Sequence, residues 1–568
     1  MSYDERPWLR SYDQGVSPDV QIPDICLVDR FDETLKRFPE RPAVHFFGTT
    51  MTYRTLMGHA NRFARALVEW GCRPGDVVGI DLPNIPQYLI AQVGTLKAGC
   101  AASGISPLFT PSEMVYQLND CKAKALIALD AIFEHRLLRV AEQLPDLKIV
   151  VVTGILDFLP KIKQILARLL KKIPSGKVTP LPGKKIIRFL DILSFYPDHP
   201  PDVKVAPEDH CLVQYTGGTT GTPKGTVLTH RCLVANLVQI NEWIKPEEGK
   251  EIGLSGFPFF HLAGLMLGMV ALAAGGAQVL IPDPRDTKHI VKEMARCGPT
   301  ILVNVPSLYM MLLEEPRFRN LDFSNLKFCI SGAAPFSVDG IKELERIIGT
   351  NKLIEVYGMT EASPIITMNP RRGKKKIGTV GLPVQGTRVK LVDVETGTRE
   401  VPVGEEGEII VQGPQVMKGY LNKPEETEIA IRELEGERWL YTGDVARMDE
   451  EGYFTIVDRS KDMVNVGGFK VFSQEVEEKL HDHPAIELCA IIGVPNPKRP
   501  GSELVKLLVQ LEQGYEERNE EDTKQDILSF ARQCLSPYKV PKIIKFMERL
   551  PLTPVGKVDK NALRSDRD

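Results

Sequence analysis

Glycines, threonines and a lysine are concentrated in one stretch, TGGTTGTPKG, at residues 216–225. Glycine lets backbone N–H groups approach a ligand closely, threonine adds hydroxyl donors, and Lys224 adds a positive charge. These groups can hold phosphate oxygens, so the stretch predicts a phosphate-binding loop. It is not a P-loop, because Pro223 precedes the lysine and Gly225 follows it. A flexible surface loop is the alternative, but the combination of hydroxyls with a lysine favours phosphate.

The elements that must position this loop have an α/β pattern. The apolar run 211–213 leads into the loop as a strand, and a helical pattern covers 87–97. Further strand-like runs lie at 77–82, 125–130, 148–154, 300–306 and 327–332. Strands that alternate with helices indicate largely parallel sheets. We therefore predict an α/β fold with a large N-terminal domain of two parallel-rich sheets.

The pattern of secondary structure changes twice in the rest of the chain. Short β-rich runs with turns at about 378–458 predict a small β subdomain. After residue 458 the pattern is mixed α and β and rich in Lys and Glu. We therefore predict an N-terminal domain at 1–458 and a small mobile α+β C-terminal domain at 459–568.

The composition is ordinary for a globular protein. The chain has 568 residues, of which 43% are hydrophobic and 26% charged, with a net charge of −3. No global charge points to a nucleic-acid partner. The 10 cysteines are scattered, which favours buried free thiols in a reducing cytoplasm. The N-terminus is polar and has no secretory apolar segment.

The apolar segment 257–281 imitates a membrane span. It contains Pro258, His261 and paired glycines, and no basic residues flank its ends. We therefore predict a buried helix followed by a strand, in preference to a transmembrane helix.

Further motifs follow the loop in order. They are SGAAPF at 331–336, EVYGMTEAS at 355–363, the stretch 439–477 from WLYTGD to SQEVE, and PLTPVGKVDK at 551–560. Together with the loop they resemble the adenylate-forming superfamily of acyl-CoA synthetases, luciferases and nonribosomal peptide adenylation domains. The resemblance covers about 31–560, and the continuation TVLTHR looks most like bacterial long-chain fatty acid CoA ligases. Many members carry Ser where this chain has Gly217, so a backbone N–H must replace that hydroxyl.

The resemblance implies an ATP-dependent reaction in two steps. A fatty acid carboxylate would attack the α-phosphate of ATP, which gives acyl-AMP and pyrophosphate, and coenzyme A would then take the acyl group and release AMP. The implied phosphate-binding residues are Thr216, Gly217, Gly218, Thr219, Thr220, Gly221, Thr222, Pro223 and Lys224. Thr219 and Glu361 would hold Mg²⁺ through oxygen ligands.

The same resemblance places the nucleoside. Tyr357 would stack on adenine, and Asp444 would accept the ribose hydroxyls. A core aromatic and an ordinary turn residue are the alternatives for these two. Backbone close to the base and further contacts would come from Gly332, Ala333, Gly358, Met359, Thr360 and Arg459.

The C-terminal domain would serve both steps in turn. Lys557 would neutralise the α-phosphate and the attacking carboxylate, although a lysine in such a loop is usually a solvated surface charge. Rotation about Lys461 would then bring up the coenzyme A path. That path is assigned to Gly467, Gly468, Phe469 and Lys470. A plain hairpin turn is the alternative for the paired glycines.

The acyl pocket is predicted to include His261 and Leu265. A lone histidine in an apolar run is commonly structural, and both interpretations stay open. We do not propose His261 as a general base, because a carboxylate nucleophile needs none.

Residues 158–174 form a basic amphipathic pattern within an insert at about 156–175. Apolar residues recur at helical spacing among lysines and an arginine, with no acidic residue. This pattern suits an anionic bilayer, so we predict peripheral contact with the inner face of the cytoplasmic membrane. A helix packed on the domain with a solvated basic face is the alternative.

Rival functions remain at this point. They are a medium-chain or aryl acid CoA ligase, an acyl-AMP ligase that loads a carrier protein, and a silent membrane protein that only binds nucleotide. The sequence also leaves the oligomeric state open, and a homodimer is one of the alternatives.

Overall fold

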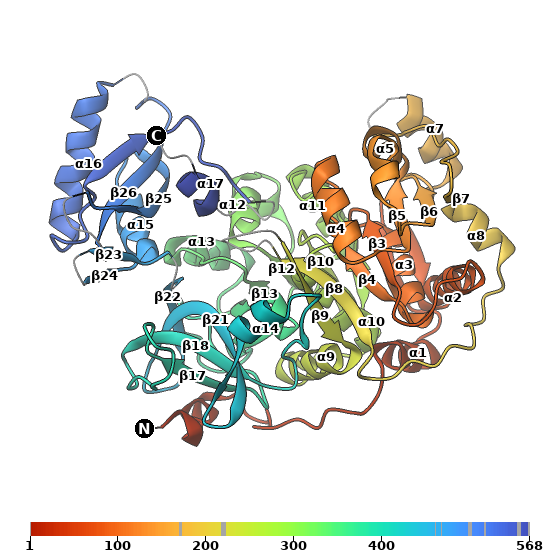
Figure 1. The fold of residues 1–568 in the computed structure, drawn as a ribbon, viewed down its shortest axis with the longest axis horizontal. Coiled ribbons are helices and arrows are strands. Elements are labelled where there is room, and N and C mark those ends of the chain that lie inside the picture. Colours follow the sequence, from red (N-terminus) through yellow and green to blue (C-terminus); the bar gives the residue numbers. More distant parts are fainter. Residues whose placement is uncertain are drawn as a thin grey trace.

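The computed structural model describes residues 2–169, 173–216, 223–459, 462–466, 469–497, 502–515, 518–553 and 558–565. Two large sheets form the centre of the molecule, and the C-terminal elements lie together at the upper left of Figure 1. Most neighbouring strands in both large sheets are parallel. The predicted α/β class with parallel-rich sheets is therefore confirmed.

The eight-stranded sheet has the order β19-β9-β8-β4-β3-β5-β6-β7. Its strands are β3 (Val77–Asp81), β4 (Ala101–Gly104), β5 (Ala125–Leu129), β6 (Ile149–Thr153), β7 (Lys185–Arg188), β8 (His210–Thr216), β9 (Lys224–Thr229) and β19 (Gly419–Tyr420). β3, β5 and β6 are buried along their whole length, as expected of strands covered on both faces. The associated helices are α2 (Tyr53–Glu69), α3 (Pro86–Lys97), α4 (Pro111–Asp120), α5 (Asp130–Ile132), α6 (Leu138–Val140), α7 (Lys161–Leu169), α8 (Phe189–Phe195) and α9 (His230–Ile244).

The nine-stranded sheet has the order β16-β15-β14-β13-β12-β10-β11-β1-β2. Its strands are β1 (Pro42–Phe46), β2 (Thr49–Thr52), β10 (Ile252–Ser255), β11 (Ala277–Val279), β12 (Ile301–Asn304), β13 (Phe328–Ser331), β14 (Leu353–Gly358), β15 (Ile365–Met368) and β16 (Leu382–Pro383). The helices around it are α1 (Leu27–Arg37), α10 (Leu262–Ala274), α11 (Thr287–Cys297), α12 (Pro306–Glu314) and α13 (Val338–Ile348).

The segment that imitates a membrane span is a buried helix and strand, as predicted. α10 has almost no exposed residue, and β11 follows it inside the sheet. Within the described part of the chain, no helix combines the length and apolarity needed to cross a bilayer. All ten cysteines are free thiols, and most are buried.

A separate antiparallel sheet follows the nine-stranded sheet. Its strands are β17 (Arg388–Val392), β18 (Glu406–Gln412), β20 (Ile431–Leu434), β21 (Glu437–Met448) and β22 (Phe454–Arg459), and α14 (Pro424–Ala430) precedes β20. β22 ends one residue after the predicted domain boundary at 458.

The C-terminal elements have a core of their own. They are β23 (Val464–Val466), β24 (Phe469–Val471), α15 (Ser473–His481), β25 (Ile486–Pro495), β26 (Glu503–Leu511), α16 (Glu520–Cys534), β27 (Ile543–Phe546) and α17 (Lys560–Ser565). Alternating buried residues of β25 and β26 pack against α15 and α16.

Candidate active site

The predicted phosphate loop joins two antiparallel strands, β8 and β9. Thr216 and Lys224 lie opposite each other where the strands end, and residues 217–222 between them are outside the described residues. The Lys224 ammonium forms an ion pair with Glu426 of α14. It also lies 5.1 Å from the centre of the Tyr420 ring. Lys224 is thus held beside a carboxylate and an aromatic face at the base of the loop.

Glu361 lies close to this lysine through a shared neighbour. It follows β14 in a short helical turn and is 5% exposed. The Tyr420 hydroxyl donates to Glu361 Oε1 at 2.8 Å, and the N–H of Met417 donates to the Glu361 carbonyl at 2.8 Å. Burial and the nearby Glu361 carboxylate raise the pKa of Tyr420, so its hydroxyl stays a donor. Tyr420 therefore links the predicted metal ligand to the predicted phosphate-binding lysine.

Tyr420 and Glu426 were missed by the sequence reasoning. Both lie in KGYLNKPEETE at 418–428, which has no glycine-rich or catalytic signature. Tyr420 reaches the site because β19 pairs with β9, opposite Thr226. A pairing of strands so far apart in sequence has no local signal.

The structure brings Tyr357 and Asp444 together. Tyr357 is in β14 and Asp444 in β21, and the Tyr357 hydroxyl donates to Asp444 Oδ2 at 2.7 Å. Asp444 is 8% exposed and lies opposite Arg459 of β22. The predicted adenine-stacking and ribose-binding residues thus share one site, although they are distant in sequence.

The glycines of this region are required by packing. A side-chain carbon at Gly358 would lie 1.8 Å from the Pro364 carbonyl oxygen, and one at Gly332 would lie 2.7 Å from the Val356 side chain. Ala333 adopts a left-handed conformation with φ 67°. Met359 and Thr360 continue the chain from β14 into the turn that carries Glu361. The close backbone approach to a base stays a prediction.

His261 is neutral in this environment. It precedes the first turn of α10, and burial lowers its pKa to about 4. Its Nε2 has no hydrogen-bond partner among the described residues. Leu265, one turn later, is buried and donates its N–H to the His261 carbonyl at 3.0 Å.

Two other buried polar groups lack partners where strands of the same sheet end. Asn304 Nδ2 and Ser331 Oγ are unsatisfied within the described part of the molecule, and these residues lie opposite each other in β12 and β13. Native proteins pair most buried polar groups, so these atoms are candidates for contact with a substrate. Asn304 carries no motif, and sequence reasoning missed it.

Glu355 adds a titratable group beneath this site. It lies in β14 two residues before Tyr357, and burial raises its pKa to about 7. The N–H of Gly378 donates to its carboxylate at 3.1 Å. No cluster of three or more His, Cys, Asp or Glu side chains that could hold a metal occurs among the described residues.

Several predicted residues of the C-terminal domain are outside the described residues. They are Lys461, Gly467, Gly468 and Lys557, and nothing is stated about the side chains of Arg459, Phe469 and Lys470. β23 and β24 are antiparallel, with Val466 opposite Phe469. The contact of the paired glycines with coenzyme A stays a prediction.

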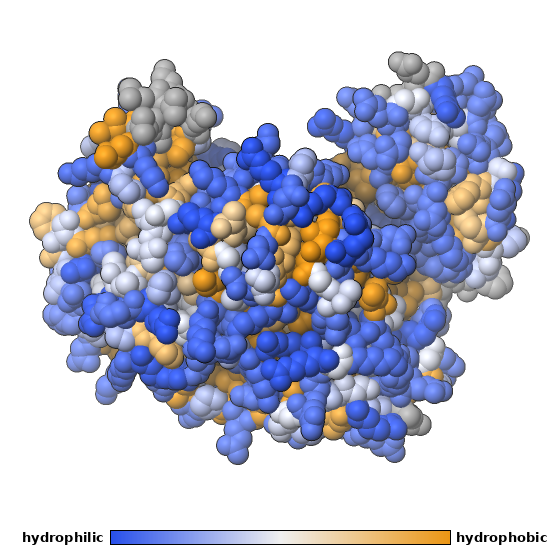
Figure 2. Space-filling model, turned by 180° about the vertical axis from the view of Figure 1, so that it is seen from behind, coloured by the Kyte–Doolittle hydropathy of each residue, from blue (hydrophilic) through white to orange (hydrophobic). Residues whose placement is uncertain are grey.

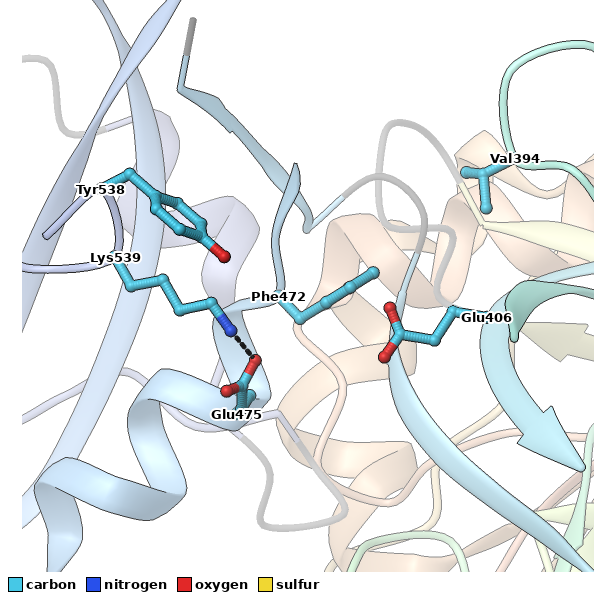
Figure 3. Close-up of a pocket in the computed structure, with 6 residues that line it drawn as sticks. All are labelled: Val394, Glu406, Phe472, Glu475, Tyr538 and Lys539. Carbon is cyan, nitrogen blue, oxygen red and sulfur yellow. Dashed lines mark hydrogen bonds and ion pairs between the residues drawn. The ribbon is translucent and has the colours of Figure 1, made fainter. Parts of the chain in front are cut away.

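A cavity of about 240 Å³ lies between the C-terminal elements and the antiparallel sheet (Figure 3). Val394 and Glu406 line one side, and Phe472, Glu475, Tyr538 and Lys539 line the other. Lys539 and Glu475 form an ion pair across the C-terminal side. The cavity is walled by both parts of the chain, so its shape depends on their relative orientation.

Comparisons with known proteins match nearly the whole chain. The model of the AMP-binding enzyme family matches residues 31–421, and the model of the AMP-binding enzyme C-terminal domain matches residues 475–557. A curated relative from Bacillus subtilis (strain 168), named long-chain-fatty-acid–CoA ligase, is 37% identical over 573 residues and is aligned over 98% of each chain.

Solved structures show the same fold. The anthranilate CoA ligase AuaEII in complex with anthranoyl-AMP is 26% identical with a TM-score of 0.80, covering 100% of this chain and 98% of that one. ATP-bound MatB from Rhodopseudomonas palustris is 27% identical with a TM-score of 0.79, covering 96% of this chain and 99% of that one.

Proposed function

Because the chain belongs to the AMP-binding enzyme family, we propose that it is an AMP-forming acyl-CoA ligase that activates a fatty acid with ATP. The observation that carries this proposal is the similarity to the B. subtilis ligase over nearly the full length of both chains. A carboxylate oxygen attacks the α-phosphorus of ATP, and the bond to pyrophosphate breaks. The coenzyme A thiolate then attacks the acyl carbon, and AMP leaves.

The phosphate groups are assigned to the β8–β9 loop. Its N–H groups and hydroxyls, from Thr216 to Lys224, bind the β- and γ-phosphates, and Lys224 adds charge at the loop base. Support comes from the position of Lys224 beside Tyr420, which also holds Glu361.

Mg²⁺ fits the donor set near this loop. It favours oxygen ligands and is usually held by one or two carboxylates with substrate phosphates. Glu361 supplies one carboxylate, and Thr219 is proposed as a second ligand. The ion, when bound, neutralises phosphate charge. Tyr420 holds the Glu361 carboxylate in place.

The nucleoside is assigned to the Tyr357–Asp444 pair. The Tyr357 ring offers a stacking face, and a two-oxygen acceptor suits the two ribose hydroxyls. Gly332 and Ala333 lie along the base edge, and Arg459, opposite Asp444, adds a contact to ribose or phosphate.

The C-terminal domain supplies Lys557 to the first step and Gly467 and Gly468 to the second, after rotation at Lys461. The attacking carboxylate and the α-phosphate of ATP are both anions and repel each other. A lysine placed between them lowers the barrier because its charge neutralises both. The neutral His261 cannot repel or attract the carboxylate by charge, and it serves the acyl pocket as a polar wall next to Leu265.

A long-chain fatty acid is the preferred substrate class, on the name of the B. subtilis relative. An aryl acid is the second candidate, because the structure of an anthranilate CoA ligase has the same fold. Exchange of pyrophosphate into ATP with oleate, decanoate and benzoate, followed by thioester formation with coenzyme A, tests the proposal. If none of these acids causes release of pyrophosphate, the proposal is refuted. If the acyl group is transferred to a carrier protein and not to coenzyme A, the acceptor is a carrier protein.

Contact with an anionic membrane is proposed for residues 158–174. Ile162 and Ile165 of α7 are 74% and 57% exposed, and Lys161 and Lys163 flank Ile162 in the sequence. Phe158, by contrast, packs on His59 and Phe189, so it anchors the helix to the domain. Figure 2 shows hydrophobic surface at its upper left, the side on which α7 lies. The prediction of a cytoplasmic location stays a prediction.

A further inference from the structure

Lys560 lies largely in the interior of the C-terminal elements. Lys560, the first residue of α17, has a side chain that is only 16% exposed. Its ammonium contacts Glu477 Oε1 at 2.7 Å and donates to Ser473 Oγ at 2.6 Å. Lysine is rarely buried unless it is paired, so this position is determined by specific partners on α15.

The partners of Lys560 are themselves fixed. Glu477 Oε1 also accepts the N–H of Ile491 in β25 at 2.6 Å. Burial raises the pKa of Glu477 to about 7, against the opposite effect of the nearby Lys560 charge. A largely buried pair of this kind resists displacement, because removal of one partner leaves the other without compensation.

The same hydrogen-bond chain continues to the strand that precedes the predicted hinge. Ser473 Oγ lies 3.0 Å from Asp458 Oδ1, and the first N–H groups of α15, from Ser473 and Gln474, donate to Asp458 Oδ2. An acidic group at a helix N-terminus satisfies unpaired N–H groups and the helix dipole. Asp458 is 4% exposed and lies in β22, three residues before Lys461.

The other end of the chain of contacts reaches the segment of Lys557. Lys560 is three residues after Lys557 in the sequence. Leu552 pairs with Val558, and the N–H of Asp559 donates to the Pro551 carbonyl at 2.8 Å, so the two ends of this loop are joined. Leu563 of α17 is buried against Ala490 and Ile492. Lys560 thus fastens an already closed loop base to α15.

We propose that Lys560 is a positioning residue for adenylation: it fixes the base of the loop that carries Lys557 to α15, and through Ser473 and Asp458 to the strand before the hinge. This inference rests on the proposed function, because it requires Lys557 to act at the α-phosphate. A misplacement of about 1 Å in a reacting group can cost about a hundredfold in rate. Only the step that uses Lys557 depends on this placement.

The test separates the two half-reactions. Pyrophosphate exchange with the best acid of the panel measures adenylation, and thioester formation from the synthetic acyl-AMP and coenzyme A measures transfer. We expect Lys560→Ala to lower exchange by about tenfold or more and to leave transfer within about twofold of the wild type. Lys560→Arg keeps the charge and the donors, and it should recover most of the exchange activity.

Lys479→Ala is the matched control. Lys479 is also a lysine paired with a glutamate, Glu475, but the Lys479 side chain is 46% exposed, so both half-reactions should be unchanged. Thermal unfolding of each variant reports folding. If Lys560→Ala does not fold, Ser473→Ala removes only the shared hydroxyl and should show the same selective loss to a smaller extent.

The outcomes are distinct. Equal loss in both half-reactions, or none in exchange, overturns the role of Lys560. Inactivity of the wild type in both assays refutes the proposed function itself.

Discussion

Tyr420→Phe tests the part of the site that has no sequence motif. The change removes one hydroxyl, which donates to Glu361 at 2.8 Å, and keeps the ring that lies beside Lys224. A hydrogen bond to a charged group contributes about 1.5–3 kcal/mol, and Glu361 is too buried to replace it fully with water. Since about 1.4 kcal/mol corresponds to a tenfold change in rate, we expect adenylation to fall by about 10- to 100-fold.

The assay is pyrophosphate exchange measured as a function of Mg²⁺ and ATP. If Tyr420 positions Glu361 for the metal, the loss should include a higher Mg²⁺ requirement, while transfer from preformed acyl-AMP stays within about twofold. Tyr53→Phe is the control, because its buried hydroxyl donates to the Ala271 and Gly276 carbonyls in the core. It should lower thermal stability and leave the Mg²⁺ dependence unchanged. An unaltered Mg²⁺ dependence in Tyr420→Phe would refute the reasoning.

Three further predictions address the tail lysine, a buried carboxyl and the membrane surface. Lys557→Ala should lose most adenylation and keep much of the transfer from acyl-AMP; equal loss in both assays would contradict its role. Burial raises the pKa of Asp81 well above its usual value, despite the positive charge of Arg136. The folded chain therefore holds a proton that the unfolded chain has released above about pH 4, and stability falls by about 1.4 kcal/mol per pH unit until the folded pKa is passed. Thermal unfolding from pH 5 to 8 should show a smaller decline in Asp81→Asn, and parallel curves would count against this. Replacement of Ile162 and Ile165 by Ser should abolish sedimentation with anionic liposomes and leave activity in detergent intact, whereas unchanged sedimentation would exclude this surface.

The fold class and several elements could be predicted from local patterns. The run 77–82 is strand β3, the pattern 87–97 is helix α3, and the apolar segment 257–281 contains α10 and β11. Periodicity and length suffice for such elements, because burial on both faces of a parallel strand or around a core helix leaves a continuous apolar run. The order of motifs likewise identified the superfamily.

The spatial relations within the site depend on contacts that no local pattern contains. The pairing of β19 with β9 places Tyr420 between Lys224 and Glu361, and the packing of α15 on β22 places Ser473 between Asp458 and Lys560. Motifs indicated which residues have the right chemistry, since backbone freedom, hydroxyls and charge are properties of residue types. Distances, burial and shifted pKa values arise only when remote segments pack together and exclude water. The partners of Glu361 and Lys560 are therefore determined by the tertiary structure.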